Sequence, residues 1–259
     1  MTAEALTELL DALSGETVEV VDLTQPLAEA TPIIQLPPPF ANTPGWKMHE
    51  ISRYDDRGPA WYWNSFEGGE HVGTHLDAPI HWVTGRDKDD VSTIPPRNLV
   101  GPASVLDLSD RVAADPDFLL SVDDVKAFER LHGPLSAGGW LLYRTGWDAR
   151  AQDQAAFLNA DDTGPHTPGV SVECARWLAE EAPIVGFGVE TVGTDAGAAH
   201  SFEPAFPCHT FLLGANKYGL TQLANLSHLP PTGVVLIVAP LKIVNGSGSP
   251  TRVLALVPR

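Results

Sequence analysis

The sequence contains few cysteines, few basic residues and no long apolar run, and each shortage excludes a class of protein. Cys174 and Cys208 are the only cysteines, which is too few for a disulfide framework or a Cys-rich zinc site. Lysine and arginine number 16 against 33 acidic residues, and the net charge of −17 argues against nucleic acid or an anionic membrane surface as a partner. No apolar run approaches the roughly 20 residues of a membrane-spanning helix.

The first residues do not predict a signal peptide. These residues, MTAEALTELLDALSGE, have neither the basic region nor the apolar core of a signal peptide, so we expect a cytoplasmic protein. The composition, with 43% hydrophobic and 19% charged residues, is typical of a globular protein. Because 259 residues suit one core and no linker or internal repeat divides them, we expect a single domain over residues 1–259.

Apolar runs that alternate with helix signals predict an α/β fold. Several runs are nearly continuous, as expected for strands of a sheet that is covered on both faces. They cover residues 18–24, 103–109, 140–147, 184–193, 234–244 and 252–257. Helices are expected over residues 3–13, from Ser121 onward and from Ser171 onward. Ser121 and Asp124 are spaced as a capping box at the start of the second of these helices. Residues 31–64, rich in proline and aromatic residues, are expected to form an ordered loop that could cover a site.

Three of the nine histidines fall in the eleven residues HVGTHLDAPIH, at positions 71–81. In a strand His71, His75 and Asp77 would share one face, but a flat strand separates His71 from His75 by about 13 Å. Donors bound to one ion at about 2.1 Å lie only a few ångströms apart, so the segment must bend, and Gly73 can adopt the conformation that a bend needs. Two imidazoles and a carboxylate suit a divalent cation such as Zn²⁺ or Mn²⁺. The segment therefore predicts a metal site.

The full pattern H-x-G-T-H-x-D-x-P-x-H resembles the signature of the cyclase-like metal hydrolases, the family that includes kynurenine formamidase and isatin hydrolase. The likeness continues through YRTGW (143–147), GVETVGTDAG (188–197), FPCHTFLLG (206–214) and LANLSHLPPTG (223–233). The resemblance implies an α/β fold in which helices flank a mixed central sheet of the swivelling β/β/α type. It also implies a homodimer or larger homo-oligomer and metal-dependent hydrolysis of amide-type bonds.

The resemblance also suggests a role for each matching residue. His71, His75 and Asp77 match the metal ligands of the family, and His81 and His209 match further histidines that line the site. By this likeness His81 is expected to accept or relay the proton of a water molecule. His209 is expected to protonate the departing nitrogen, because an amide anion is a poor leaving group unaided.

The chain departs from the formamidase pattern at one position. Where those enzymes carry a glutamate that helps to hold a second zinc ion, this sequence has Thr221 or Gln222, depending on the register. Neither is a carboxylate, and a second divalent cation is harder to hold without it. The isatin-hydrolase-like branch therefore resembles the chain better, with one metal ion, Mn²⁺ or Zn²⁺, and Gln222 as the candidate for a further oxygen ligand.

Four more residues are candidates for contact with a small-molecule substrate. Trp61 and Trp63, just upstream of the cluster, and Trp82, directly after it, could stack on a flat ring, although aromatic triplets are usually part of a core. His166 lies in a loop rich in glycine and proline that could reach the site, and it could equally be an exposed histidine. Glu190 and Asp195, at the end of an apolar strand and in the turn after it, could orient a ligand histidine or bind substrate, and could equally cap a helix or form a salt bridge.

The function that we expect is hydrolysis of a small amide, most plausibly a cyclic one such as isatin, by water that the metal activates. An aryl formamidase and a lactone hydrolase remain alternatives within the same class. A non-catalytic metal- or ligand-binding protein is the alternative of another class, and His81 and His209 argue against it because a pure metal holder needs no such histidines. A further alternative is a metal ion that only stabilises the loop, which would be favoured if four protein ligands enclosed the ion and left no position for water.

Overall fold

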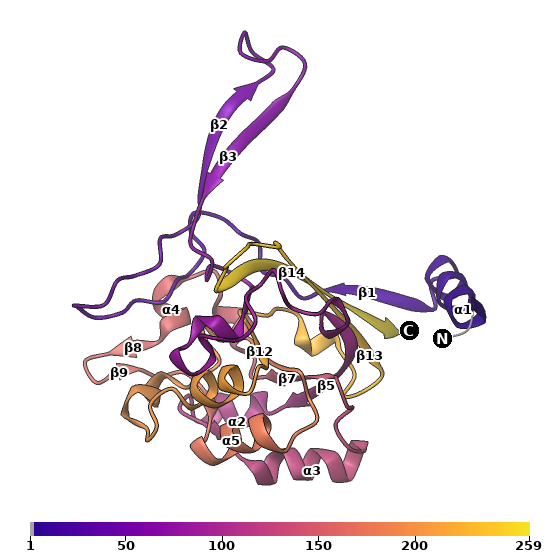
Figure 1. Cartoon of the computed structure of the whole chain (residues 1–259), viewed down its shortest axis with the longest axis vertical. Helices are drawn as coiled ribbons and strands as arrows, with labels where there is room; N and C mark the ends of the chain where they lie inside the picture. Colours follow the sequence, from indigo (N-terminus) through magenta and orange to yellow (C-terminus); the bar gives the residue numbers. More distant parts are fainter. Residues whose placement is uncertain (1–2) are drawn as a thin grey trace.

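The computed structural model describes residues 3–259, and a mixed eight-stranded sheet forms its centre (Figure 1). The strand order is β1-β14-β13-β5-β7-β11-β12-β4. Neighbours among β5, β7, β11 and β12 run parallel, and all other pairs in this sheet are antiparallel. The bounds are β1 Val18–Asp22, β4 His75–Asp77, β5 Val100–Asp107, β7 Trp140–Arg144, β11 Gly186–Val189, β12 Tyr218–Thr221, β13 Val234–Pro240 and β14 Gly248–Pro258.

The sheet closes on itself because β14 pairs with β4 as well as with β13. The first residues of β14 pair with β4, and its later residues pair with β1 along the same edge. The three-residue strand β4 is thus hydrogen-bonded on both edges, to β12 and to β14. The result is a barrel-like arrangement of seven strands, with β1 attached to β14.

Alternating side chains divide the buried residues into two cores. One core fills the inside of the barrel and includes Trp140 and Leu142 of β7 and Leu76 of β4. Gly186 and Gly188 leave space for it: a Cβ at Gly186 would lie 2.3 Å from the Trp140 ring. The strands are therefore buried on both faces, as the continuous apolar runs predict.

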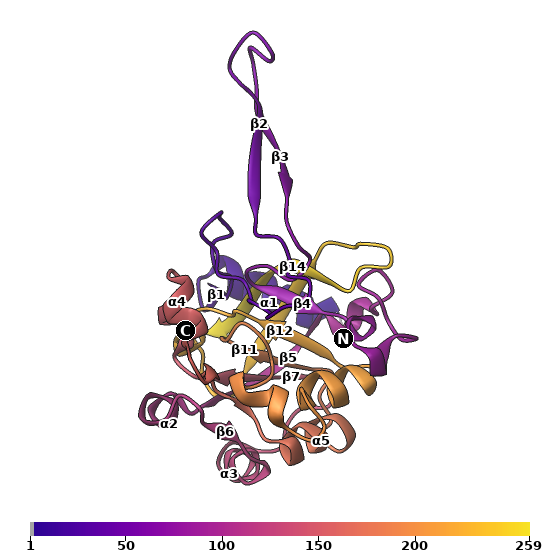
Figure 2. The same cartoon turned by 90° about the vertical axis from the view of Figure 1, so that its left-hand side faces the viewer.

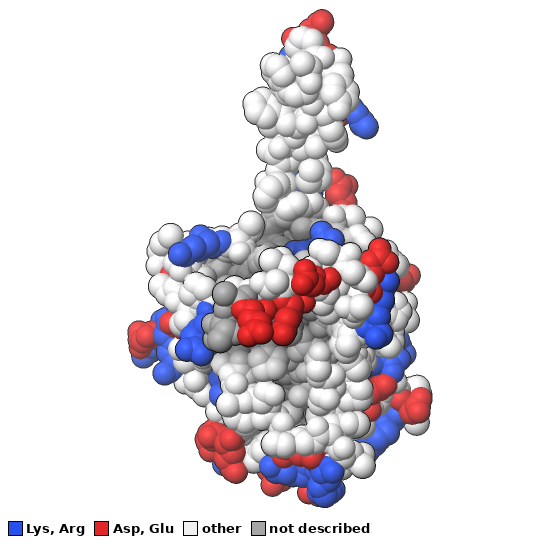
Figure 3. All heavy atoms as spheres, turned by 90° about the vertical axis from the view of Figure 1, so that its right-hand side faces the viewer, with Lys and Arg blue, Asp and Glu red and all other residues white. Residues whose placement is uncertain are grey.

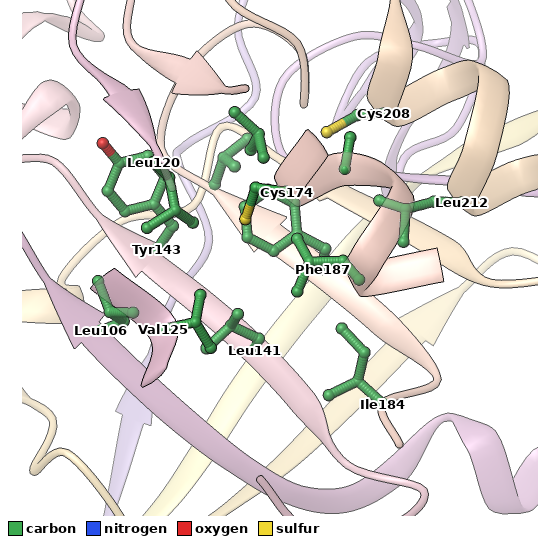
Figure 4. Packing of buried hydrophobic residues seen from close by; sticks show 14 of the residues in the cluster. Leu106, Leu120, Val125, Leu141, Tyr143, Cys174, Ile184, Phe187, Cys208 and Leu212 are labelled. Atoms are coloured by element: carbon green, nitrogen blue, oxygen red, sulfur yellow. The ribbon is translucent and has the colours of Figure 1, made fainter. Parts of the chain in front are cut away.

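The other core lies between the outer face of the sheet and the helices (Figure 4). Leu141, Tyr143 and Phe187 from the sheet pack there against Val125 and Cys174 from two helices. These helices are α3 (Val122–His132) and α5 (Val172–Glu180). The capping box that the sequence predicts between Ser121 and Asp124 is present, and Ser171 caps α5. The expected α/β class, with a mixed sheet flanked by helices, is confirmed.

Shorter elements complete the chain. The remaining helices are α1 (Ala3–Ser14), α2 (Ser109–Ala114) and α4 (Gln154–Leu158). Two-residue strands pair as β6 (Leu119–Leu120) with β10 (Gly169–Val170), and as β8 (Ala160–Asp161) with β9 (Gly164–Pro165). Within residues 3–259, no helix combines the length and the apolar character that crossing a bilayer requires. Cys174 and Cys208 are buried free thiols.

The prediction of a loop over residues 31–64 is wrong for its second half. Residues Lys47–Arg53 (β2) and Tyr62–Glu67 (β3) form an antiparallel hairpin that projects from the body as an arm (Figure 2). The arm keeps most of its apolar side chains exposed: Met48, Ile51, Tyr54, Trp61, Tyr62, Trp63 and Phe66. Its visible surface is largely uncharged, with charged residues at the tip and along the sides (Figure 3). The sequence pattern missed the hairpin because neither strand alternates buried and exposed residues.

Candidate metal centre and catalytic site

Strand β4 presents two of the predicted metal ligands on its outer face. Leu76 points into the barrel, and His75 and Asp77, one residue to either side, point the other way. Both are almost fully buried, with 4% and 2% exposure. The sheet fixes their places, because His75 is paired with Thr221 of β12 and Asp77 with Gly219.

A bend at Gly73 brings His71 to the same place. Gly73 has a φ of +62°, a left-handed conformation that favours glycine. His71 Nδ1 lies 2.8 Å from Asp77 Oδ1, and His75 Nε2 lies 3.4 Å from the same oxygen. The imidazole of His71 fits closely against the chain, since a Cβ at Gly248 would approach its ring to 2.4 Å. The bend that the sequence predicts is therefore present.

These three side chains fit a divalent cation. Donors bound to one ion at about 2.1 Å lie roughly 3 to 3.5 Å apart. The 3.4 Å separation of His75 Nε2 from Asp77 Oδ1 falls in this range, and the 2.8 Å separation of His71 Nδ1 from the same oxygen is slightly shorter. His75 Nδ1 lies 2.7 Å from the carbonyl oxygen of Gly73, so that this nitrogen donates and the lone pair of Nε2 faces Asp77. Burial alone would raise the pKa of Asp77, but its interactions with the neighbouring His71 and His75 rings hold it well below the usual range, so it is a carboxylate.

Thr221 and Gln222, between which the sequence leaves the choice open, have different surroundings in the structure. Thr221 Oγ1 lies 2.9 Å from His75 Nδ1. Gln222 is buried, and its Oε1 has no hydrogen-bond partner among the described residues. Its Nε2 donates to the carbonyl oxygen of Pro32 at 3.3 Å. An unpaired buried amide oxygen costs free energy unless a ligand satisfies it, and a cation is such a ligand.

The opposite wall of the site carries the remaining histidines. His81 ends the 3-10 turn Pro79–His81, and His209 begins the π-helical turn His209–Leu213. The His81 ring lies 4.0 Å from the His71 ring and 5.5 Å from the His209 ring, between centroids. The side-chain donors of His71, Asp77 and His81 all lie within 4.8 Å of one another. His81 is therefore near enough to the cluster to act either on a bound water or as a ligand.

Asp195 holds His209 in place. Its Oδ2 lies 2.5 Å from His209 Nδ1 and accepts the backbone N–H of His209, while Oδ1 accepts the backbone N–H of Cys208. This contact agrees with the role of orienting a histidine that the sequence suggested for Asp195. It leaves His209 Nε2 as the free ring nitrogen, and the Trp82 ring lies 4.8 Å from the His209 ring.

The two histidines of this wall differ in protonation. Burial lowers the pKa of His81 to about 3, and the charges of His71 and His209 contribute in the same direction. Burial would also lower the pKa of His209, but the hydrogen bond and charge of Asp195 outweigh it and raise this pKa. At neutral pH His81 is thus uncharged and only weakly basic, whereas Asp195 shifts His209 toward its protonated form.

Of the four candidate substrate residues, the structure brings only Trp82 to the cluster. Trp82 Nε1 donates to Thr210 Oγ1, and its ring lies 5.6 Å from that of Phe206. Trp61 and Trp63 lie on the arm, which points away from the body that carries β4 (Figure 2). His166 lies after β9, where its imidazole pairs with Asp117 and Asp161 instead.

The start of the segment over residues 31–64 lies against the site. Thr31, together with Leu27 just before the segment, lies next to Gly73, and the Pro32 carbonyl oxygen accepts a hydrogen bond from the Gln222 side-chain amide. Gln154 of α4 fixes the segment through two hydrogen bonds, from Ile33 N to its Oε1 and from its Nε2 to Ile33 O. Nothing in the local sequence of Gln154 marks it for this contact, which joins residues far apart in the chain.

Comparisons with known proteins point to one family. The model of the Cyclase family matches residues 21–196. The chain is 54% identical to the isatin hydrolase of Roseibium aggregatum over 250 residues, 95% of this chain and 94% of that protein. It is 30% identical to a kynurenine formamidase of Salinibacter ruber, over 70% of this chain and 74% of that protein. A crystal structure of an isatin hydrolase bound to the product analogue thioisatinate matches it with a TM-score of 0.97 and 52% identity, over 100% of both chains.

Proposed function

The chain belongs to the cyclase family of metal-dependent hydrolases, in the isatin-hydrolase-like branch, and on this premise we propose that it opens a small cyclic amide, isatin or a close analogue, to the carboxylate. The observation that carries the proposal is the likeness to isatin hydrolases over nearly the whole chain, with a TM-score of 0.97. The geometry supports the same chemistry, because the candidate ligands lie beside two histidines whose pKa values are shifted in opposite directions.

We assign one divalent ion to the cluster, Mn²⁺ or Zn²⁺, held by His71, His75, Asp77 and the Oε1 atom of Gln222. When bound there, such an ion polarises a carbonyl group and makes water more acidic. The donor set contains a single carboxylate, Asp77, which compensates one divalent charge better than two. The mixed nitrogen and oxygen donors suit both Mn²⁺ and Zn²⁺.

The chain's own residues move the protons. His81, neutral and adjacent to His71, accepts a proton from the attacking water, which then adds to the amide carbonyl carbon. When the C–N bond breaks, His209 donates its proton to the ring nitrogen, so that the product leaves as a neutral arylamine with a new carboxylate. Asp195 holds His209 in the orientation for this transfer. Trp82, beside His209, provides an apolar surface for a flat ring.

A formamidase is the second candidate, and the 30% identity to a kynurenine formamidase favours it. The chain lacks a carboxylate at Thr221 and Gln222, and so it lacks the ligand with which those enzymes hold a second ion. One screen separates the possibilities. Purified protein, loaded with Mn²⁺ or stripped with a chelator, is tested on isatin, N-formylkynurenine and an aryl lactone.

We expect metal-dependent turnover of isatin above that of the other two substrates. Faster turnover of N-formylkynurenine or of the lactone would replace the proposed substrate class. Binding of isatin without turnover of any of the three would indicate the non-catalytic ligand-binding alternative. Turnover that the chelator leaves unchanged would remove the metal from the proposal.

We also propose that the protein is a homodimer or larger homo-oligomer. The arm, residues 47–67, leaves a row of aromatic side chains exposed that no other described part of the chain covers, including Trp61 at 47% and Trp63 at 54% exposure. Exposed apolar surfaces of this kind mark interaction sites. A contact of Trp61 or Trp63 with substrate would then have to come from the arm of a second copy.

Sedimentation of the Trp61→Ser, Trp63→Ser double variant tests the assembly. We expect the wild type to sediment as a dimer or larger and the variant to dissociate at micromolar concentration. A monomeric wild type would overturn the proposal. Unchanged assembly of the variant would exclude these two side chains from the interface.

A further inference from the structure

Two polar residues, Ser247 and Glu70, form a hydrogen-bond network with the imidazole of His71, on the side of the ring away from Asp77. His71 Nε2 lies 2.9 Å from Ser247 Oγ. The Ser247 hydroxyl in turn donates to Glu70 Oε2 at 2.6 Å, and the backbone N–H of Ser247 donates to the same oxygen at 3.1 Å. Glu70 directly precedes His71, whereas Ser247 directly precedes β14. These hydrogen bonds therefore join two segments that are far apart in the sequence.

The directions of these hydrogen bonds determine which nitrogen of His71 carries the proton. A carboxylate such as Glu70 can only accept, so the hydroxyl hydrogen of Ser247 points to Glu70. Its oxygen is then an acceptor toward His71, and Nε2 must be the donor. In a neutral imidazole this leaves the lone pair on Nδ1, the atom that faces Asp77 at 2.8 Å.

We propose that Glu70 and Ser247 are positioning residues that keep His71 in the tautomer and orientation in which Nδ1 can bind the divalent ion. The inference rests on the proposed metal site, because it assigns His71 a ligand atom there. Histidine ligands usually donate their other ring N–H to a protein acceptor, and loss of that acceptor typically costs about 10- to 100-fold in metal affinity. His75 has such a partner in the carbonyl oxygen of Gly73, and Ser247 is the corresponding partner of His71.

Metal affinity is the first test. Electron paramagnetic resonance of free Mn²⁺ gives the dissociation constant for the wild type and for Ser247→Ala and Glu70→Gln. We expect Ser247→Ala to bind Mn²⁺ about 10- to 100-fold more weakly. Glu67→Gln is the matched control, since it removes one charge from an exposed residue of the arm and should leave the affinity unchanged. Wild-type affinity in Ser247→Ala would overturn the inference, whereas failure of the wild type to bind Mn²⁺ would overturn the metal site itself.

A double-mutant cycle tests whether Glu70 acts through Ser247. Residues in one hydrogen-bond network show non-additive effects, so adding Glu70→Gln to Ser247→Ala should weaken binding no further. Additive losses would mean that Glu70 acts through its charge alone, and would overturn its role as a positioning residue.

Nitrogen NMR of the Zn²⁺-loaded protein, labelled with ¹⁵N-histidine, reports the tautomer directly. We expect a protonated Nε2 for His71 in the wild type and a loss of this single tautomer in Ser247→Ala. A purely structural role of Ser247 would leave the tautomer unchanged. A proton on Nδ1 of His71 in the wild type would overturn the assignment of the ligand atom.

Discussion

The two walls of the site are built in different ways. The wall that carries the candidate metal ligands consists of strands, and the register of β4 with β12 and β14 fixes His75 and Asp77 through backbone hydrogen bonds. The opposite wall consists of a 3-10 turn and a π-helical turn, and one carboxylate, Asp195, orients its key histidine. Backbone pairing tolerates changes of side chain, whereas a side-chain contact is lost with a single substitution. Metal binding and proton transfer should therefore be separable by mutation.

The largest effect is expected on the strand wall. His75→Ala or Asp77→Ala should reduce the metal content from about one divalent ion per chain to nearly none, and turnover should fall to background. Elemental analysis of the purified variants measures this. Asp87→Ala is the matched control, because Asp87 lies ten residues away with an exposed side chain. Two full equivalents in the wild type would contradict a single-ion site.

On the opposite wall, His209→Ala and His81→Ala should keep the metal and lose about 10²- to 10⁴-fold in kcat, the usual contribution of a positioned acid or base. Metal content and steady-state turnover, measured on the same samples, check this. The donors of His81 lie close enough to His71 and Asp77 to coordinate the ion. If His81→Ala loses metal and activity together, His81 is a ligand and the division between the walls is wrong.

Gln222→Ala should weaken metal binding by about 10- to 100-fold, if its unpaired oxygen supports the ion. Gln222→Glu should keep the first ion and recruit a second at high metal concentration, because it adds the carboxylate that the formamidase pattern has. Calorimetric titration with Mn²⁺ gives both affinity and stoichiometry. Wild-type affinity in Gln222→Ala would mean that Thr221 or water completes the site.

Asp195→Asn tests the orientation of His209. The Asp195 carboxylate raises the pKa of His209, and the acid must be protonated to act. Activity is therefore lost as the pH rises through this pKa, and the variant should lose it at lower pH than the wild type. We expect about a 10-fold drop in kcat at neutral pH, less than the 10²- to 10⁴-fold contribution of the acid itself because His209 is still present, with unchanged metal content. A pH profile of kcat that keeps its alkaline limb would contradict this role.

The smallest effect is expected at Glu190, which neither wall uses. Burial, together with the charge of Asp148, raises the pKa of Glu190 from 4.5 to about 7. The folded state then binds the proton more tightly than the unfolded state, so the stabilisation is present below pH 4.5 and is lost as the pH rises through 7. A side-chain amide does not titrate in this range, so Glu190→Gln should gain on the order of 1 to 3 kcal/mol relative to the wild type between pH 5 and 8. Denaturant unfolding at both pH values measures the free energy of unfolding of the wild type and of the variant. A difference between the two proteins that does not change with pH would contradict the prediction.

The sequence predicts the candidate metal ligands better than the contacts that support them, because the ligands His71, His75 and Asp77 lie in one short segment. Residues 71–81 contain the bend and three candidate ligands, and spacing arguments apply within such a range. The closeness of Gly248 to His71, of Ser247 to Glu70 and of Gln154 to Ile33 depends on pairings across more than a hundred residues. No local pattern encodes these contacts.

The arm shows another limit of prediction from sequence. The sequence predicts a loop where β2 and β3 form, and it places Trp61 and Trp63 near the cluster of the same chain. Strand prediction relies on one face being buried by the rest of the protein, and the arm has exposed side chains on both faces. The strong signals belong to α3, α5 and the barrel strands, whose apolar residues are covered within the chain.

The double pairing of β4 has a consequence for folding. His75 is bonded into strands that follow it by 146 and 175 residues, at Thr221 and Pro250, and such non-local pairings are slow to form because loop closure costs entropy first. The ring of strands therefore fixes His75 and Asp77 in their native geometry only when it is complete, so we expect an ion to bind the native state more tightly than the unfolded chain. An ion that binds the native state alone adds about 2.7 kcal/mol of stability at a hundred times its dissociation constant. Binding of the ion would thus stabilise the whole folded barrel. The free energy of unfolding of a newly made chain would then depend on the concentration of the metal ion in the cell.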